Sequence, residues 1–411
     1  MMRVIYNFSI YLLGFGIALS SLFNTKSKQW IKGRRSWRKN LKTSLSTIEN
    51  PIWIHCSSLG EFEQGRPVIE ALKERGEKIL LTFFSPSGYL NLKDYRFADH
   101  VSYIPLDSTK NAKDFVKIVK PKAAIFIKYE FWFNHICACK KQSVPIFLLS
   151  GIFRSEQHFF KIYGHWFRKH LEWYSHIFVQ NRESMSLLES IGMTNASISG
   201  DTRYDRVIKV ATSPLPLSEL DSWAKGKQVL VAGSTWVEDE KIIAQLASGE
   251  PSVAVIIAPH LVDKAHLDEI ILLMGPAAML YSQFLADPNS NPHVIVIDTI
   301  GLLSSIYRMA DLVYIGGGFG KGVHNCLEAA VYGKVLFFGP RYQKFDEAKK
   351  MVAMGSAFPV TNAKEFLAKG RQYLTDDVAR EALARKNGLF VKEHSGATAK
   401  VIDTLSGIID V

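Results

Sequence analysis

Two short segments combine residue types that could do chemistry. The first is a glycine-rich run at residues 316–325 (GGGFGKGVHN), between a predicted strand and a predicted helix. Glycines let a ligand approach the backbone, and a helix N-terminus offers unpaired N–H groups to a phosphate. The run is therefore typical of a nucleotide phosphate site, although a tight strand-to-helix turn explains the glycines equally well. Its spacing is not that of a P-loop, which argues against ATP hydrolysis.

The second segment is residues 55–61 (HCSSLGE), where a predicted strand runs into a glycine turn and a helix. Glu61 falls in the first helical turn, where a carboxylate stabilises the helix dipole by about 0.3–1 kcal/mol. It could instead act as a general base. Glu328, three residues after Asn325, has two similar interpretations, a capping-box carboxylate or a contact to ribose hydroxyls.

Metal chemistry is not indicated by the residue spacing. The histidines lack a ligand pattern such as H-E-x-x-H, and no Asp-x-Asp pair is present to hold a divalent ion on a phosphate. The four cysteines lack the paired spacing of a structural zinc site and fit a reducing compartment. We therefore expect neither a metal ion nor another cofactor.

The elements that must position these residues alternate between short β-branched or aromatic runs and amphipathic stretches, which predicts βαβ units and parallel sheets. The fold class is therefore α/β, with two doubly wound domains facing a cleft and ligands at the carboxyl ends of the strands. Strands are predicted at residues 52–56, 78–84, 101–104, 123–127, 145–149, 177–179, 196–199, 228–232, 253–258, 294–297, 312–315 and 335–338. Helices of the second half are predicted at residues 238–246, 302–309, 325–331 and 345–354.

Charge is unevenly distributed along the 411-residue chain. Nine lysines or arginines and no acidic residue lie before residue 44, so the rest of the protein is nearly neutral despite a net charge of +11. A nucleic-acid-binding protein would carry its excess of positive charge on the folded domains. Nucleic acid is therefore not an expected partner.

The N-terminus has the composition of a membrane anchor. Residues 4–23 form an uncharged apolar run of twenty residues, and eight cations follow between Lys26 and Lys42. That length suits a bilayer-spanning helix, and the positive-inside rule keeps the cations and the domains behind them cytoplasmic. Docking on the membrane surface is the alternative, because Asn7, Ser9 and two glycines are unfavourable in a span. A cleaved signal peptide would carry its charges before the apolar run. The predicted domains are residues 1–42 (anchor), 43–210, a Pro- and Ser-containing linker at 211–221, and 222–411.

Five motifs together resemble the Kdo transferases of Gram-negative bacteria, which move 3-deoxy-D-manno-octulosonic acid (Kdo) from its CMP conjugate onto the lipid A precursor. The motifs are residues 54–61 (IHCSSLGE), 82–88 (TFFSPSG), 232–236 (AGSTW), 298–301 (DTIG) and 323–328 (VHNCLE). The resemblance runs from about residue 34 to the C-terminus. It implies a GT-B fold, in which two Rossmann-like domains bind the acceptor (first) and the donor (second).

The resemblance also implies site residues. Glu61 matches the catalytic base, and Glu130 and Arg203 match polar positions that support the transition state. The positions matching CMP contacts are Pro259, His260, Ile300, Gly301, Leu302, Asn325, Cys326, Leu327 and Glu328. The chain departs from the family pattern where Glu-x-Glu reads Lys128-Tyr129-Glu130, Pro-Arg-His reads Pro259-His260-Leu261, and Gly-Glu-Leu reads Gly301-Leu302-Leu303.

The function implied is that of an inverting glycosyltransferase that adds Kdo to lipid IVA at the cytoplasmic face of the inner membrane. Its expected partners are CMP-Kdo, the lipid A precursor and the membrane. Two alternatives remain open. One is a GT-B nucleotide-sugar transferase or epimerase with a different donor, and the other is a membrane-bound scaffold without catalysis.

Overall fold

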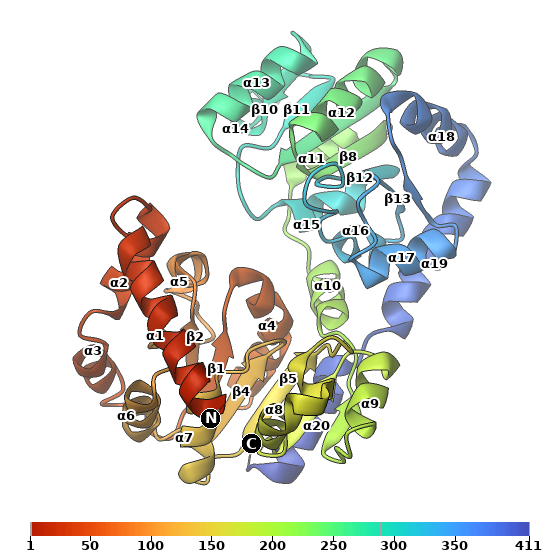
Figure 1. The fold of residues 1–411 in the computed structure, drawn as a ribbon. Coiled ribbons are helices and arrows are strands. Elements are labelled where there is room, and N and C mark those ends of the chain that lie inside the picture. The colour runs from red at the N-terminus through yellow and green to blue at the C-terminus, as the bar shows by residue number, and fades with distance from the viewer. Residues whose placement is uncertain (1, 288, 411) are drawn as a thin grey trace. The chain divides into compact units, whose positions relative to one another are not determined.

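The chain folds into two compact units, each built on a parallel sheet (Figure 1). The computed structural model describes residues 2–287 and 289–410. The first unit comprises Met1–Arg206 and Ser395–Val411, and the second comprises Val207–His394. Each unit contains a seven-stranded sheet whose strands all pair in parallel. The predicted α/β class with two doubly wound sheets is confirmed.

The sheet of the first unit has the strand order β3-β2-β1-β4-β5-β6-β7. Trp53 and Phe126 face one layer of helices, while Ile54 and Ile125 face the other, as the two-residue period of a strand requires. The strands are β1 (Ile52–Cys56), β2 (Ile79–Phe83), β3 (His100–Tyr103), β4 (Ala123–Ile127), β5 (Ile146–Gly151), β6 (His176–Val179) and β7 (Ala196–Ile198). The helices are α4 (Leu59–Glu74), α5 (Pro86–Leu92), α6 (Thr109–Val119), α7 (Phe133–Lys141), η1 (His158–Phe160), η2 (Ile162–Gly164), α8 (His165–Leu171) and α9 (Arg182–Glu189).

The sheet of the second unit has the order β10-β11-β9-β8-β12-β13-β14. Its strands are β8 (Gln228–Thr235), β9 (Val253–Pro259), β10 (Ala278–Leu280), β11 (Val294–Val296), β12 (Leu312–Ile315), β13 (Val335–Phe338) and β14 (Ala357–Pro359). The helices are α11 (Ser218–Ala224), α12 (Val237–Gly249), α13 (Lys264–Met274), α14 (Tyr281–Ala286), α15 (Leu303–Ile306), η3 (Tyr307–Met309), α16 (Leu327–Ala330), α17 (Asp346–Ala353), α18 (Ala363–Thr375) and α19 (Asp377–Glu393). The sequence did not predict the two three-residue edge strands β10 and β14.

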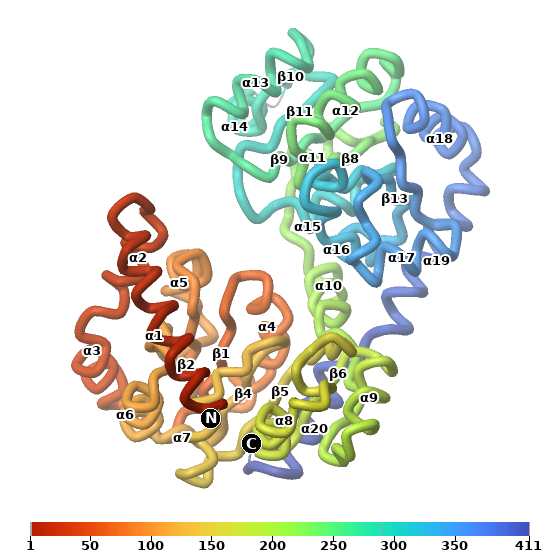
Figure 2. The backbone as a smooth tube through the Cα atoms, in the orientation of Figure 1, coloured from red at the N-terminus to blue at the C-terminus, as the bar shows by residue number. Residues whose placement is uncertain are grey.

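Three helices precede the first strand: α1 (Met2–Ser20), α2 (Thr25–Arg34) and α3 (Trp37–Ser44). Figure 2 shows α1 running along the first unit, where the Tyr6 ring meets Phe133 of α7 with ring centroids 5.1 Å apart. Among the described residues, α1 is the one helix long and apolar enough to cross a membrane. The buried Arg34 side chain at the end of α2 donates to the carbonyl oxygens of Ile104 and Phe84. The basic segment after α1 is therefore packed onto the first unit rather than extended.

The division into units differs from the predicted ranges in two places. The helix α10 (Arg203–Thr212) crosses from one unit into the other, so the division falls before the predicted linker at residues 211–221. The last helix, α20 (Ala397–Ile408), belongs to the first unit instead of the second, because Val401, Ile402 and Leu405 are buried in a core cluster of the first sheet. The amphipathic pattern of a helix does not specify which of two cores will receive it.

Candidate functional site

Two carboxyl groups follow neighbouring central strands of the first unit. Glu61 is in the first turn of α4, after β1, and Glu130 follows β4, which pairs with β1 in parallel. The backbone N–H of Ser58 donates to Oε2 of Glu61 over 2.9 Å, so Glu61 does cap its helix. The charge of Glu130 is close enough to raise the pKa of Glu61, so the two carboxyl groups belong to one site.

Two hydrogen-bond donors and one further close contact surround the Glu130 carboxylate. Its side chain is 8% exposed, and Oε2 accepts hydrogen bonds from the Ser57 hydroxyl and the Trp132 indole N–H. The fully buried His55 ring places Nε2 3.3 Å from the same oxygen, a close contact whose angles are outside those of a good hydrogen bond. These groups favour a negative charge on Glu130.

The orientation of the His55 ring is set by Thr82 on the adjacent strand β2. Nδ1 of His55 lies 2.9 Å from the Thr82 hydroxyl oxygen, which also accepts from the indole N–H of Trp53. The Thr82 hydroxyl proton has two acceptors in reach, Nδ1 of His55 at 2.9 Å and the Ile54 carbonyl oxygen at 3.4 Å. Donation over the shorter distance leaves the imidazole proton on Nε2, facing Glu130. Burial lowers the pKa of His55, so the ring is a neutral donor at physiological pH.

The shared environment pushes the two carboxyl pKa values apart. For Glu130, burial favours the neutral form, but His55, Ser57 and Trp132 outweigh it and lower the pKa below the usual value. For Glu61, burial and then the charge of Glu130 raise the pKa to about 7. Two interacting carboxyl groups of this kind provide one stable anion and one group able to exchange a proton near neutral pH.

Arg203, the third predicted catalytic residue, engages a different partner. Its guanidinium binds Asp201 through Nε at 2.9 Å and Nη2 at 2.7 Å. The neighbouring Thr202 hydroxyl donates to the backbone carbonyl of Gln64 in α4, so the loop after β7 is tied to the helix that carries Glu61. The structure therefore brings Glu61 and Glu130 together and fixes Arg203 on the same unit through Asp201.

The glycine-rich turn of the second unit is packed closely against its neighbours. A Cβ on Gly316 would lie 2.2 Å from the Ser234 carbonyl oxygen, so only glycine fits there. Gly317 has a φ of +88°, and its N–H donates over 2.9 Å to the buried Asp239 carboxylate. The turn interpretation thus accounts for Gly316 and Gly317, and the N–H of Gly317 is already occupied by a protein carboxylate.

The predicted donor residues differ in what they offer a ligand. Nδ2 of Asn325 donates to Oε1 of Glu328 over 2.9 Å at the start of the four-residue helix α16. Cys326 and Leu327 are fully buried and belong to the packing of the unit. Gly301 has a φ of +96°, Leu302 precedes α15, and the Ile300 side chain is 83% exposed. Pro259 ends β9, directly before His260.

A stack of three rings is the feature that the sequence analysis missed. The His260 ring contacts two other rings, with centroids 4.7 Å from Trp236 and 4.5 Å from His324 and interplanar angles of 24° and 22°. The Trp236 indole N–H donates to Nε2 of His324 over 3.1 Å. Burial, and then the neighbouring His260, lower the pKa of His324 to about 4. The only sequence signal was that all three residues follow predicted strands, each in a separate segment.

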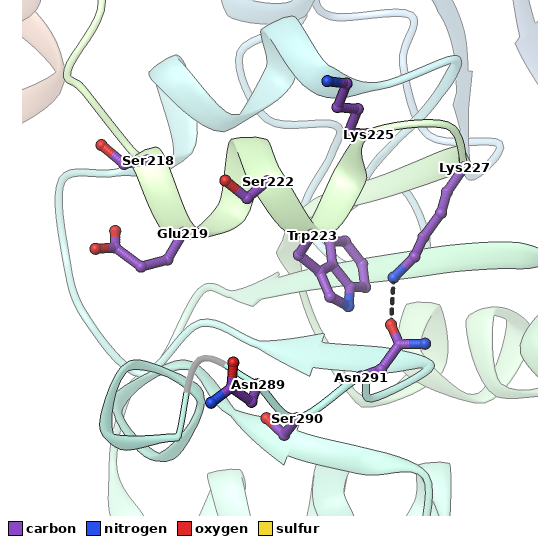
Figure 3. A pocket seen from close by; sticks show the side chains of 9 residues that line it. All are labelled: Ser218, Glu219, Ser222, Trp223, Lys225, Lys227, Asn289, Ser290 and Asn291. Atoms are coloured by element: carbon purple, nitrogen blue, oxygen red, sulfur yellow. Dashed lines mark hydrogen bonds between the residues drawn. The ribbon is translucent and has the colours of Figure 1, made fainter.

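A separate pocket of the second unit lies elsewhere and is unsuited to the predicted donor (Figure 3). It has a volume of about 520 Å³ and is lined by residues of α11 and of the segment before β11. Nζ of Lys227 donates to Oδ1 of Asn291 across it, over 2.6 Å. Lys227 and Asn291 precede β8 and β11, so this pocket is at the amino ends of the strands, whereas ligands of such sheets bind at the carboxyl ends.

Known proteins resemble this chain in sequence over most of its length. The family model described as 3-deoxy-D-manno-octulosonic-acid transferase (kdotransferase) matches residues 31–206. The 3-deoxy-D-manno-octulosonic acid transferase of Bordetella pertussis is 25% identical, over 86% of each chain. The enzyme of the same name from Rickettsia felis is 27% identical, over 95% of this chain and 89% of its own. The chain is thus similar to Kdo transferases over most of its length.

The chain also has a GT-B-like fold by comparison with solved structures. The UDP-GlcNAc 2-epimerase of Neisseria meningitidis aligns with a TM-score of 0.59 at 16% identity, over 87% of this chain and all of that one. MurG of Acinetobacter baumannii aligns with a TM-score of 0.53 at 14% identity, over 87% and 99% of the two chains. At these identities the likeness concerns the fold alone. The chain therefore has a GT-B-like fold.

No group of three or more His, Cys, Asp or Glu side chains placed to hold a metal ion occurs among the described residues. Glu61 and Glu130 both accept hydrogen bonds from protein donors. The chemistry that the pair can do is proton transfer, with Glu130 as the fixed anion and Glu61 as the exchanging acid.

Proposed function

We propose that the protein transfers Kdo from CMP-Kdo to the lipid A precursor lipid IVA, with inversion at the anomeric carbon and Glu61 as the catalytic base. Sequence similarity to Kdo transferases supports the donor and the acceptor class. The observation that carries the assignment of the base is the pKa of about 7 that burial and Glu130 give Glu61. A helix-capping carboxylate needs no such shift, whereas a general base works best with a pKa near the working pH.

In the proposed reaction, the ionised Glu61 removes a proton from an acceptor hydroxyl. The hydroxyl oxygen attacks the anomeric carbon of Kdo, and the bond from that carbon to the phosphate oxygen breaks. CMP leaves with the electron pair of that bond, and Glu61 carries the proton. Glu130 keeps the proton affinity of Glu61 high, and Arg203 supplies a cation on the same unit.

On the donor side, we propose that Asn325 and Glu328 bind the nucleotide, together with Pro259, His260, Ile300, Gly301 and Leu302. The ring stack gives His260 a fixed orientation. Cys326 and Leu327 act by packing beneath Asn325 and Glu328, because both are fully buried. The proposal includes no metal ion and no other cofactor.

We further propose that α1 attaches the protein to the cytoplasmic face of the inner membrane. The apolar composition of α1 and the cations that follow it support this location. The acceptor is a lipid, so attachment places the enzyme at the surface where its substrate is dissolved.

The experiment that tests the proposal replaces Glu61 by Gln, which keeps the shape and the helix cap but cannot accept a proton. Transfer from CMP-Kdo to lipid IVA should fall by a factor of about 10²–10⁴. Glu63→Gln is the matched control, since Glu63 lies on the same helix at a more exposed position. Mass spectrometry of the lipid product identifies the sugar transferred.

Parent-like turnover by a folded Glu61→Gln protein would remove Glu61 from the catalytic role. A product that lacks Kdo, formed by the parent protein, would instead support a different nucleotide-sugar donor. Activity of neither kind, with CMP binding retained, would favour the scaffold alternative.

A further inference from the structure

The helix α1 is attached to the first unit by polar contacts along its inner face. The Tyr6 hydroxyl donates to Oδ2 of Asp107 over 2.5 Å, and Oδ1 of Asn7 accepts from Nδ2 of Asn134 over 2.9 Å. One and two turns further on, Ile10 is buried and a Cβ on Gly14 would lie 2.8 Å from the Leu106 side chain. The contacts recur every three to four residues, so they hold one continuous face of the helix.

The opposite face of α1 is apolar and open. Its exposed large side chains are Val4, Ile5, Phe8, Tyr11, Leu12, Leu13, Phe15 and Leu19, each between 42% and 71% exposed, followed by Leu22 and Phe23. A helix of 19 residues extends over about 28 Å. Exposed apolar surface that is continuous over such a length marks an interaction site with a partner or a membrane.

A membrane-spanning orientation of α1 conflicts with its inner contacts. If α1 crossed the bilayer while attached, Asp107, Asn134 and the surrounding polar surface would enter hydrocarbon, which is prohibitively costly. If α1 detached in order to cross, Asp107 and Asn134 would lose their partners on α1. A helix that lies in the interface keeps these contacts and buries its outer face in lipid.

A basic cavity lies beside the first turn of α1. It has a volume of about 500 Å³, and four cations line it: Arg3 of α1, Lys113 and Lys117 of α6, and Lys141 of α7. The other residues that line the cavity have small or uncharged side chains and include Thr109, Asn134 and Ala138. In the part of the chain that the structure describes, none of the four cations has a carboxylate within ion-pair distance.

From this geometry we propose that α1 lies in the plane of the cytoplasmic membrane surface, with its N-terminus on the same side as the two units, and that the basic cavity takes the phosphate of an anionic lipid. The ligand of the cavity is a lipid of the anionic bilayer itself, because the cations of the cavity adjoin the open apolar face of α1 at Arg3. A bilayer can contact both surfaces at once. This inference concerns membrane topology and does not depend on the identity of the transferred sugar.

The topology is tested with inverted inner-membrane vesicles from a bacterium that produces the full chain, since these vesicles expose their cytoplasmic face. Met2→Cys is introduced together with Cys137→Ser, because the other three cysteines are buried. A membrane-impermeant maleimide should label Met2→Cys equally before and after detergent is added. Ser46→Cys, at an exposed position after α3, is the control for a cytoplasmic site.

Labelling of Met2→Cys only after detergent, while Ser46→Cys is labelled without it, would show that α1 spans the membrane and would overturn the proposal. A cysteine at position 15, on the outer face of α1, distinguishes burial in lipid from burial in protein. In vesicles the maleimide should label Phe15→Cys slowly, because lipid covers the side chain. The same variant should be labelled readily once the protein is extracted into detergent-free buffer at low concentration. Rapid labelling in vesicles would contradict insertion of the outer face.

The lipid site is tested by flotation with vesicles of phosphatidylcholine alone or mixed with phosphatidylglycerol. Replacing Lys113, Lys117 and Lys141 by Gln should weaken binding to the anionic vesicles about a hundredfold, roughly fivefold for each cation near the surface. The control replaces the exposed Lys225, Lys241 and Lys364 of the second unit by Gln. Binding to phosphatidylcholine should change little in either variant.

Equal losses in the two triple variants would refute the lipid site, because general charge would then explain the attraction. Calorimetry with inorganic phosphate alone separates a lipid from a soluble anion. Tight binding of free phosphate at the cavity in the absence of vesicles, abolished by the first triple variant, would overturn the choice of a lipid. Kdo transfer to a detergent-dispersed acceptor gives an independent readout of whether the transferase itself is intact.

Discussion

In the first unit, two candidate carboxyl groups share one site, and their pKa values are displaced in opposite directions. The candidate residues of the second unit are instead distributed over three turns that follow β9, β11 and β12. Several of these residues are occupied by the fold itself: Cys326 and Leu327 are buried, and Gly317 donates to Asp239. Reactive chemistry requires a group kept away from its ordinary pKa, while recognition requires only a fixed surface. The comparison therefore supports the proposal that the first unit carries proton transfer and the second binds the donor.

The largest expected effect concerns the support of the glycine-rich turn. Asp239 is 1% exposed and accepts from the N–H groups of Trp236 and Gly317 and from the Tyr314 hydroxyl. Asp239→Ala leaves three donors without their acceptor and should lower the free energy of unfolding by about 3–5 kcal/mol. Glu238→Ala, at the exposed neighbouring position, is the control in urea denaturation. A loss no larger than that of the control would show that the turn does not depend on Asp239.

The next effect tests whether the second unit binds the donor. Glu328→Ala should weaken CMP binding by about 1–3 kcal/mol, the value for a lost hydrogen bond to a charged group. Glu381→Ala, at an exposed position of α19, is the matched control. Isothermal titration calorimetry measures both. An unchanged affinity in a folded Glu328→Ala protein would remove Glu328 from the nucleotide site and would weaken the assignment of donor binding to this unit.

Much of the fold could be predicted because parallel strands with two covered faces read as short continuous apolar runs. The predictions for β1, β4, β12 and β13 match the observed bounds. The strands β10 (Ala-Met-Leu) and β14 (Ala-Phe-Pro) were missed because neither contains a β-branched residue and β14 ends in proline. The equally short β7 and β11 contain isoleucine or valine and were predicted. The helix predicted at residues 325–331 is the four-residue α16, since the tight turn before it takes up residues 316–326.

The site could be predicted only in part, because its energetics depend on contacts between distant segments. The sequence placed Glu61 and Glu130 after predicted strands, but their coupling depends on β1 and β4 being neighbours. The donation from Gly317 to Asp239 joins residues 78 positions apart. No local spacing encodes such a contact, and the same holds for the stack formed by Trp236, His260 and His324.

A smaller effect should show how much free energy of unfolding is lost when the ionised Glu61 is held near Glu130. A folded-state pKa of about 7, above the ordinary value, means that Glu61 contributes stability below about pH 4.5, which is lost as the pH rises through 7. Glu61→Gln keeps the helix cap and cannot ionise, so the variant does not lose this stability as the pH rises. The variant should therefore be more stable than the parent at pH 8 by about 1–2 kcal/mol, and no more stable at pH 4.5. Thermal unfolding at the two pH values measures this, and a variant that is less stable at pH 8 would contradict a strained base.

The smallest effect, a displacement of the pH profile, tests the origin of the difference between the two units. Glu61 must lose its proton to act as a base, so the rate of Kdo transfer should rise with pH up to about 7 and then level off. Glu130→Gln removes the neighbouring charge but not the burial of Glu61. The acid limb of the profile should then move to lower pH by about one unit, and the plateau should fall by about tenfold because a weaker base drives proton removal less well. His55, Ser57 and Trp132 surround Glu130 and stay in place, and Glu63→Gln controls for a general loss of negative charge on α4. If the acid limb stays where it is in Glu130→Gln, burial alone sets the pKa of Glu61, and Glu130 has to act on the substrate rather than on the base.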